Sequence, residues 1–309
     1  MEATAGNGPR RPALWQWARR RAYRLQLRER WRALGVPRVY EVAVDGRPVR
    51  FLTDHPYTKW WFHRNRRDGF LGGWHEPSVT AFLVEAIRTR ETFVDVGAHL
   101  GYFSVLFATR PGHRALAVEF DPSNAFELGR QVAFQPADIR RRIEVVHCGI
   151  ADAPGELAVP QARPLYPGHA AVPATGDPRD SVRVPILPLD QLVRERGFAP
   201  EVVKIDVEGL EERVLEGASE VLERFRPVLL IEVHPEKMGA FGSTPAAVGH
   251  RLERAGYRLF TFADHRAHHL SPLSEAWDPG ARTNHDLVAV PDSPGTAEMV
   301  AAYNRRAAG

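Results

Sequence analysis

The chain has 309 residues, of which 44% are hydrophobic and 26% are charged, and this balance excludes a disordered or fibrous protein. Lys and Arg number 41 against 38 Asp and Glu, so the net charge is only +3 and gives little support to a polyanionic partner. Cys148 is the single cysteine, which excludes an intramolecular disulfide and a cysteine-rich zinc site.

The N-terminal segment mixes arginines with Trp and Leu in a pattern that predicts a helix over residues 11–34. These arginines stand where a secretory signal would have its apolar core, so we expect a cytoplasmic protein. We expect no transmembrane segment, because no run approaches about 20 apolar residues. Arginine-rich helices more often cover a neighbouring surface than bind lipid or nucleic acid, and a polyanion site is the alternative.

Two strands are predicted on either side of Asp45-Gly46, a dipeptide that supplies the positive φ of a tight hairpin turn. A helix is predicted to begin near Pro77-Ser78. We therefore divide the chain into an N-terminal extension of basic helix and hairpin (residues 1–75), a main domain (76–292) and a C-terminal tail (293–309). Four aromatic residues before the main domain either line a cleft mouth or belong to ordinary core: Trp60, Trp61, Phe62 and Trp74.

From residue 92 onward, apolar strands alternate with helical patterns, which predicts a mostly parallel, seven-stranded sheet with helices on both faces. The strands are expected at Thr92–Val96, Ala115–Glu119, Ile143–His147, Val202–Asp206 and Pro227–Val233, with an antiparallel edge pair at 257–262 and 285–291. The helices are expected at Tyr102–Ala108, Asn124–Phe134, Leu189–Arg196, Glu211–Glu223 and Pro245–Ala255. The Pro- and Gly-rich residues between the third and fourth strands predict an insertion over one end of the sheet.

A glycine turn follows the first of these strands, at the edge where an open parallel sheet binds its ligands. Gly97 and Gly101 allow a ligand to approach the backbone closely. A dinucleotide fingerprint would need glycine at His99 and Tyr102, and no Gly-Lys-Ser or Gly-Lys-Thr phosphate loop occurs. The turn therefore favours a ligand that has a ribose but no pyrophosphate.

Two carboxylates flank this turn. Asp95 lies just before it, where it can hold turn amides or meet an ammonium group. Glu119 ends the next strand, where an acidic residue accepts hydrogen bonds from a ribose diol. A glutamate in that position is often only a solvated residue or a helix-start contact, but the two carboxylates together with the glycines indicate a nucleoside site.

Four motifs in order make a family resemblance specific: "FVDVGAHLGYFS", "AVEFDPSN", "VVKIDVEGLEERVLEGA" and "VLLIEVHPE". They resemble the successive motifs of the FkbM family of S-adenosylmethionine-dependent methyltransferases, from about Glu76 to His234. The resemblance implies a Rossmann-like class I methyltransferase fold, with residues 76–292 as the methyltransferase domain. It also implies S-adenosylmethionine as the cofactor.

By this resemblance, three residues would cradle the methionine part of the cofactor and a fourth would bind its ribose: Asp95, Gly97 and Gly101, and then Glu119. His99 stands where the family usually has Asn, and we keep it among the cofactor-binding residues. Asp152 would approach the adenine amino group. The alternative for Asp152 is a turn residue before Pro154-Gly155.

Polar residues also follow the fourth and fifth strands. Asp206 ends the fourth strand, whereas Glu232 and His234 stand two residues apart on the fifth and so face the same way. Methyl transfer from a sulfonium requires the protein to position the acceptor and take its proton. An imidazole suits that proton transfer, so His234 is the candidate general base, oriented by Asp206 and Glu232 unless these bind acceptor hydroxyls. The alternative is that His234 only caps the sheet and that Lys204 pairs with a carboxylate.

These three side chains could ligate Mg²⁺ or Mn²⁺, but no short fixed ligand spacing supports a metal site, and we predict none. The family resemblance implies O-methylation of a hydroxyl on a sugar, natural-product or glycolipid acceptor, with no nucleic-acid partner. The alternatives are a nucleic-acid-modifying or nucleic-acid-binding protein that uses the arginine-rich helix, a nicotinamide oxidoreductase, which the missing third glycine disfavours, and a non-catalytic scaffold.

Overall fold

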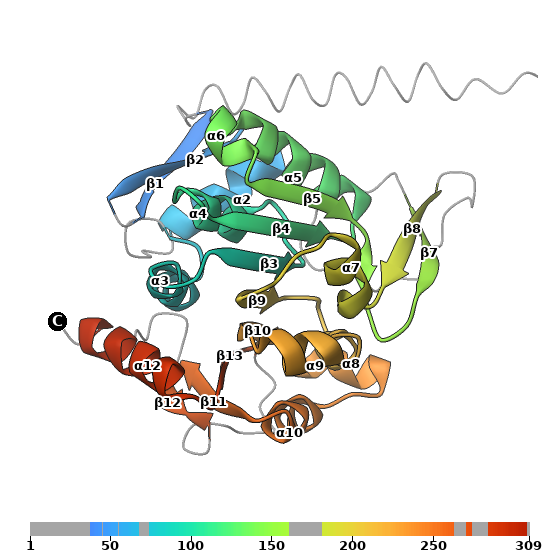
Figure 1. Ribbon diagram of the computed structural model, residues 1–309. Helices are drawn as coiled ribbons and strands as arrows, with labels where there is room; N and C mark the ends of the chain where they lie inside the picture. Colours follow the sequence, from blue (N-terminus) through green and yellow to red (C-terminus); the bar gives the residue numbers. More distant parts are fainter. Residues whose placement is uncertain are drawn as a thin grey trace, which may run out of the picture.

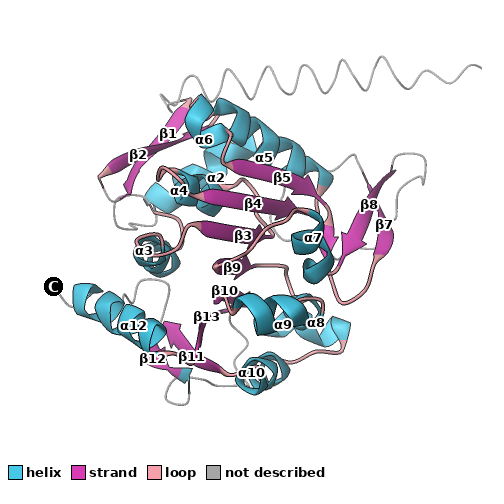
Figure 2. Cartoon of the chain, viewed as in Figure 1, coloured by secondary structure: helices cyan, strands magenta, loops and turns pink. Residues whose placement is uncertain are grey.

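The computed structural model describes residues 38–44, 46–54, 56–67, 74–160, 181–262, 270–273 and 284–307. The helix predicted over residues 11–34 lies outside these ranges. Figure 1 shows a central twisted sheet with helices on both of its faces, and Figure 2 shows the same alternation of strand and helix along the chain. This is the Rossmann-like α/β arrangement that the sequence predicts.

Eight strands of the described residues form the main sheet, in the order β12-β11-β13-β10-β9-β3-β4-β5. Its parallel strands are β5 (Ile143–His147), β4 (Arg114–Glu119), β3 (Thr92–Val96), β9 (Val202–Ile205) and β10 (Val228–Val233). Its antiparallel strands are β13 (His285–Pro291), β11 (Tyr257–Phe262) and β12 (Leu270–Pro272). The predicted pairing of the last two long strands is confirmed, but seven strands was one too few, because the short β12 carries no strand pattern of its own.

Alternate strand residues enter two cores on opposite faces of the sheet. One core joins Phe93, Val202 and Leu230 to helices α3 (Pro77–Ala86), α4 (Tyr102–Ala108), α5 (Pro122–Phe134) and α12 (Pro294–Ala307), and we call this side the α3–α4 face. The other core joins Val94 and Val203 to helices α7 (Leu189–Glu195), α8 (Glu211–Glu216) and α10 (Pro245–Arg254). The predicted covering of both faces is thereby confirmed.

The hairpin predicted around Gly46 is present as β1 (Val39–Val44) and β2 (Arg47–Leu52), with Gly46 at φ +73°. The side-chain amide of Gln131 on α5 accepts from and donates to the backbone of Leu52, at 2.8 and 2.9 Å. Helix α2 (Pro56–Arg67), which the sequence analysis did not predict, follows the hairpin, and its Phe62 stacks on Phe51 of β2. The hairpin and α2 are therefore built onto the α3–α4 face.

Residues between β5 and α7 form a separate three-stranded sheet of β6 (Gly149–Ile150), β8 (Ser181–Leu187) and β7 (Gly155–Pro160). Figure 1 shows β7 and β8 beyond the arrowheads of β4 and β5. The described parts of the predicted insertion, residues 149–160 and 181–187, thus lie beside one end of the main sheet.

The remaining described helical segments are short: α6 (Ala137–Arg140), the π-helix η3 (Val221–Phe225), α9 (Pro235–Met238) and the 3-10 turn η4 (Gly239–Phe241). The helix expected over Glu211–Glu223 is interrupted, since α8 ends at Glu216 and helical structure resumes at residue 219 and continues into η3. A Cβ at Gly217 would lie 2.1 Å from the carbonyl oxygen of Ala151, so the chain passes against the backbone of the insertion there.

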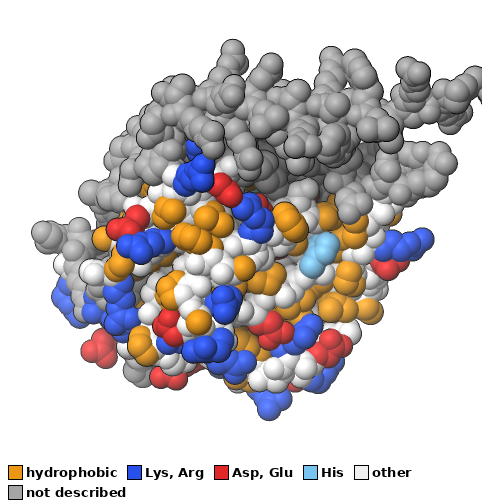
Figure 3. Space-filling view, turned by 90° about the horizontal axis from the view of Figure 1, so that it is seen from above, with side chains coloured by type: hydrophobic (Ala, Val, Ile, Leu, Met, Phe, Trp, Pro, Cys, Tyr) orange, Lys and Arg blue, Asp and Glu red, His pale blue; other side chains and the backbone are white. Residues whose placement is uncertain are grey.

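Figure 3 shows one face of the molecule with acidic and basic side chains interspersed among hydrophobic ones in the part not covered in grey. Within the described residues, no helix has the length and apolar character needed to cross a membrane. Neither observation identifies a partner.

Candidate functional site

A row of buried ionisable residues crosses the α3–α4 face near the carboxyl ends of the strands. Asp95 on β3 lies in register with Lys204 on β9, and Glu232 on β10 with Asp286 on β13. The Lys204 ammonium lies 3.1 Å from Asp206 and 3.8 Å from Glu76, the residue before α3. Four carboxylates thus surround or adjoin one lysine on this face: Glu76, Asp95, Asp206 and Glu232.

The charges of this row control each other's protonation. Burial alone would lower the pKa of Lys204, but the carboxylates around it, led by Asp206 and Glu76, raise that pKa well above its usual value. Burial raises the pKa of Glu232, and the negative charges of Asp206 and Glu76 raise it further. Lys204 is therefore a fixed cation, and one carboxyl of the row holds a proton more tightly than usual.

The glycine turn lies directly against the end of β9. Gly97 and Gly101 have φ values of +85° and +79°, in the left-handed region that favours glycine. A Cβ at Gly97 would lie 1.9 Å from the backbone oxygen of Asp206. The amides of Gly97 and Ala98 both donate to the Val118 carbonyl at the end of β4. The turn therefore joins the predicted cofactor residues to the predicted catalytic residues.

Asp95 supports this turn from inside the protein. Its carboxylate is buried and accepts a hydrogen bond from the Ser104 hydroxyl of α4 at 2.6 Å. Burial raises the pKa of Asp95 to about 6, and Lys204 and Ser104 oppose that rise. The structure thus places Asp95 beneath the glycine turn, where it holds the first turns of α4 and faces Lys204.

The carboxylate of Glu119 accepts backbone hydrogen bonds with both of its oxygens. One carboxylate oxygen accepts from the amide of His99 at 2.7 Å, and the other accepts from the amide of Asp121 at 2.8 Å. Burial raises its pKa to about 7, and these two amide hydrogen bonds oppose the rise. Each oxygen has further lone-pair capacity, so Glu119 can also accept hydrogen bonds from a ribose diol.

His99 connects the glycine turn to α2. Its φ is +53°, and its Nε2 atom lies 2.6 Å from the hydroxyl of Tyr57. The ring of Trp61 packs edge-on against His99 with centroids 5.4 Å apart. Burial lowers the pKa of His99 to about 4, with His75 adding to the effect, so the ring is neutral at ordinary pH. Helix α2 thus covers the turn through Tyr57 and Trp61. The contact between Tyr57 and His99 was not predicted from the sequence.

The four aromatic residues singled out in the sequence divide between core and surface. Trp61 and Phe62 are buried, the Trp74 indole donates to the Ala43 carbonyl, and Trp60 is 40% exposed. Only Trp61 is in contact with a predicted cofactor residue, His99.

Asp152 lies in the turn between β6 and β7 and forms an ion pair with Arg213 of α8 at 3.3 Å. It is exposed, and it pairs with this arginine rather than with a residue of the glycine turn. The structure therefore does not bring Asp152 into direct contact with the other predicted cofactor residues, and its adenine contact remains a prediction.

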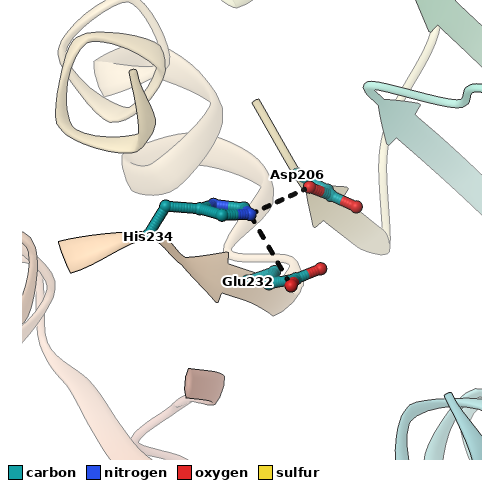
Figure 4. Close-up of side chains that lie close together, drawn as sticks. All are labelled: Asp206, Glu232 and His234. Carbon is teal, nitrogen blue, oxygen red and sulfur yellow. Dashed lines mark ion pairs between the residues drawn. The ribbon is translucent and has the colours of Figure 1, made fainter. Parts of the chain in front are cut away.

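His234, Asp206 and Glu232 do come together, as Figure 4 shows. His234 follows β10 and is buried, and its Nε2 atom lies 3.6 Å from Glu232 and 3.8 Å from Asp206. The shorter contact is on the other ring nitrogen, where Nδ1 lies 2.7 Å from a carboxylate oxygen of Glu211. Glu211 was not predicted from the sequence. Glu208, which lies 3.3 Å from Nε2, was not among the predicted site residues, although it belongs to the same "KIDVEGLEE" run as Lys204 and Asp206.

The environment of His234 favours its charged form. Burial lowers the pKa of His234, but the hydrogen bond with Glu211 and the charges of Asp206 and Glu232 outweigh burial and raise it above the usual imidazole value. The imidazole therefore gives up its proton at a higher pH than a histidine in water does.

Donor atoms of Asp206, Glu232 and His234 lie within 4.8 Å of one another, and so do those of Glu76, Glu232 and Asp286. Both groups also lie beside positive charge, from Lys204 or from His234. The negative charge of the carboxylates is thus partly offset by side chains of the protein. The absence of a metal ligand set remains a prediction.

The family model of the methyltransferase FkbM domain matches residues 95–259, more than half of the chain. The chain belongs to the FkbM methyltransferase family. The family predicted from the four motifs is therefore confirmed, and this FkbM-family chain carries the glycine turn, Glu119, Asp206 and His234 within the matched region. Tyr57, Trp61 and Glu76 contact the site from outside that region.

Solved methyltransferase structures resemble this FkbM-family chain only distantly. The FkbM methyltransferase from Methylobacillus flagellatus KT is 21% identical, with a TM-score of 0.43 over 65% of this chain and 43% of that one. A putative O-methyltransferase from Klebsiella pneumoniae is 14% identical, with a TM-score of 0.41 over 77% of this chain and 90% of that one. An O-methyltransferase from Bacillus cereus in complex with SAH is 13% identical, with a TM-score of 0.40 over 74% of this chain and 88% of that one. This chain spans less than half the length of the Methylobacillus chain, and the comparison with curated proteins found no match.

Glu119→Gln tests the nucleoside role of this FkbM-family residue. The amide oxygen can still accept a backbone hydrogen bond, but the variant lacks the charge that strengthens hydrogen bonds from ribose hydroxyls. We expect S-adenosylhomocysteine to bind about 10- to 100-fold more weakly, since hydrogen bonds to charged groups contribute roughly 1.5–3 kcal/mol. Calorimetric titration measures the loss, with the 2′-deoxyribose analogue as control. Equal losses for both ligands would show that Glu119 only supports the turn.

Proposed function

We propose that this protein transfers a methyl group from S-adenosylmethionine to a hydroxyl of a sugar, natural-product or glycolipid acceptor. The observation that carries the proposal is the close approach of Gly97 to the backbone of Asp206. This approach puts the candidate cofactor turn and the cluster around His234 at one edge of the sheet, where open α/β sheets bind ligands.

The residues around the turn fit a nucleoside cofactor of this kind. Gly97 and Gly101 give the turn its left-handed conformation, Asp95 and Ser104 support it from below, and Glu119 offers lone pairs to a diol. His99, held by Tyr57, would lie on the methionine side, and Asp152 would approach the adenine. When bound, S-adenosylmethionine supplies a methyl group activated by the adjoining sulfonium.

The cluster at the ends of β9 and β10 then acts on the acceptor. His234 Nε2 is the base that takes the hydroxyl proton, because Nδ1 is occupied by Glu211 and Nε2 lies among the carboxylates. Asp206 and Glu232 accept hydrogen bonds from acceptor hydroxyls and hold the reacting oxygen near Nε2. Should His234 not be the base, Asp206 is the next candidate.

The charge of the site favours a neutral polyhydroxyl acceptor. Glu76, Asp95, Asp206 and Glu232 gather around Lys204, so carboxylates outnumber the lysine. Carboxylates accept hydrogen bonds from hydroxyls and repel phosphate or carboxylate groups. A neutral sugar ring therefore fits this edge better than a phosphorylated one.

Calorimetric titration with S-adenosylhomocysteine, beside NADH, tests the cofactor. We expect saturable binding of S-adenosylhomocysteine alone. NADH binding in its place would support the oxidoreductase alternative, and failure of both in protein shown to be folded would overturn the cofactor assignment. Labelled methyl transfer to neutral sugars and polyketide alcohols, compared with sugar phosphates, then tests the acceptor, and transfer confined to sugar phosphates would contradict the charge argument.

A further inference from the structure

Glu211 is a fully buried carboxylate that the proposed chemistry does not yet use. One of its oxygens accepts hydrogen bonds from the amide of Gly209 at 2.9 Å and from Nδ1 of His234 at 2.7 Å. Its other oxygen has no hydrogen-bond partner among the described residues. A buried carboxylate with one unsatisfied oxygen is costly, so a purely structural explanation is incomplete.

The chain before α8 is shaped so that Glu211 reaches His234. Glu208 and Gly209 both have positive φ, at +59° and +107°. A Cβ at Gly209 would lie 2.8 Å from the Cβ of Lys237, so this turn packs closely on α9, the helix that begins immediately after His234. Lys237 also forms an ion pair with Glu208. The turn at Glu208 and Gly209 therefore packs tightly on α9, next to His234.

The contact with Glu211 determines which ring nitrogen of His234 is available. A carboxylate oxygen can only accept, so Nδ1 must carry the proton of this hydrogen bond. In the neutral ring, Nε2 then carries a lone pair. The carboxylates that face Nε2 are Glu208, Glu232 and Asp206, at 3.3, 3.6 and 3.8 Å. The acidic side chain next along α8, Glu212, accepts a hydrogen bond from the Ser243 hydroxyl instead.

We propose that Glu211 is the positioning residue of His234, holding it in the Nδ1–H form so that Nε2 is directed at the acceptor hydroxyl. This inference rests on the proposed function, in which His234 is the base. As the new oxygen–carbon bond forms, the acceptor proton moves to Nε2, and the electrons of the broken sulfur–carbon bond stay on sulfur. The ring then becomes an imidazolium whose positive charge faces Glu211.

The pH dependence follows from the groups that face His234. Glu211 from α8, Glu208 from the turn, Asp206 from the end of β9 and Glu232 from β10 are the acidic ones, and Lys237 from α9 is the nearby cation. Glu211→Gln removes one of these negative charges but keeps an oxygen that can accept both hydrogen bonds. The pKa of His234 should fall, and turnover, which needs the unprotonated ring, should persist to lower pH.

Nitrogen-15 NMR of histidine-labelled full-length protein, recorded at a pH where the His234 ring is neutral, reads the tautomer without any need for turnover. The signal of His234 is identified by its loss in His234→Gln. We expect the Nδ1–H form in the wild type and in Glu211→Gln, and a mixture of tautomers in Glu211→Leu. In kinetics, we expect Glu211→Gln to lower kcat by about tenfold at high pH with KM unchanged, and Glu211→Leu to lower it by about 100-fold. Glu216→Gln, on the same helix but paired with half-buried Arg251, is the control and should match the wild type.

The outcomes separate the two claims. An Nε2–H tautomer in the wild type, or an unchanged tautomer and pH profile in Glu211→Leu, would overturn the role of Glu211. A fixed Nδ1–H tautomer in a protein that binds no S-adenosylhomocysteine would instead overturn the proposed function and leave the Glu211–His234 pair standing. If Glu211→Leu does not fold, the role of Glu211 is still tested by the wild-type tautomer and by the shift in the pH profile of Glu211→Gln.

Discussion

Turnover by His234→Gln is expected to fall by about 100-fold or more, because removing a general base typically costs 10²- to 10⁴-fold in rate. S-adenosylhomocysteine affinity should stay within about twofold, since His234 is assigned to the acceptor and not to the cofactor. Radiolabelled methyl transfer and calorimetry on the same preparation check both expectations. His250→Gln, which alters an exposed histidine of α10, is the matched control.

The same assignment predicts the pH profile of the wild type. A base must be unprotonated to act, and the surroundings of His234 raise its pKa. The rate should therefore rise with pH through a value above the ordinary imidazole pKa of about 6.5. Undiminished turnover in His234→Gln with this profile intact would move the base to Asp206 or Glu232.

Gly97→Ala is expected to abolish measurable cofactor binding and to lower the free energy of unfolding by about 2–5 kcal/mol. The new methyl group would lie 1.9 Å from the backbone oxygen of Asp206, and φ at this position is +85°. Both the turn and the end of β9 must shift, so the two halves of the site separate. Urea denaturation and titration with S-adenosylhomocysteine measure the two effects.

Gly112→Ala is the control that separates the effect of backbone strain from the effect of the contact between Gly97 and Asp206. Gly112 has nearly the same φ, +87°, but nothing lies within 4 Å of the Cβ that it would gain. The free energy of unfolding of the Gly112→Ala variant should fall by only about 1 kcal/mol, the cost of an alanine in the left-handed region. The variant should bind the cofactor normally. If the two variants behave alike, the contact between Gly97 and Asp206 has no role in assembling the site.

The sequence predicts the strands and helices around the glycine turn well, because the apolar patterns that indicate them are local. The strand before the glycine turn and the helix after it have the bounds expected from their apolar patterns, Thr92–Val96 and Tyr102–Ala108. His234, Asp206 and Glu232 also meet as expected, because the carboxyl ends of neighbouring parallel strands share one edge. Periodicity and topology together are sufficient for these features.

The parts that the sequence does not predict depend on contacts between distant residues. Nothing in the residue types shows that Tyr57 reaches His99, 42 positions away, or that Glu76 reaches Lys204. Glu211 lies in a quoted motif, but only the left-handed turn at Glu208 and Gly209 brings it to His234. Likewise, the early end of α8 results from Gly217 passing against Ala151, which no helix periodicity reveals.

The contacts of α2 also bear on the segment that the family model matches. The match begins at Asp95, yet Tyr57 and Trp61, which hold the ring of His99, precede it, as does Glu76, which faces Lys204. The segment that the family model matches therefore does not contain every side chain that contacts the site. If the protein were cut back to that segment, the ring of His99 and the ammonium of Lys204 would each lose a neighbour that the structure gives them.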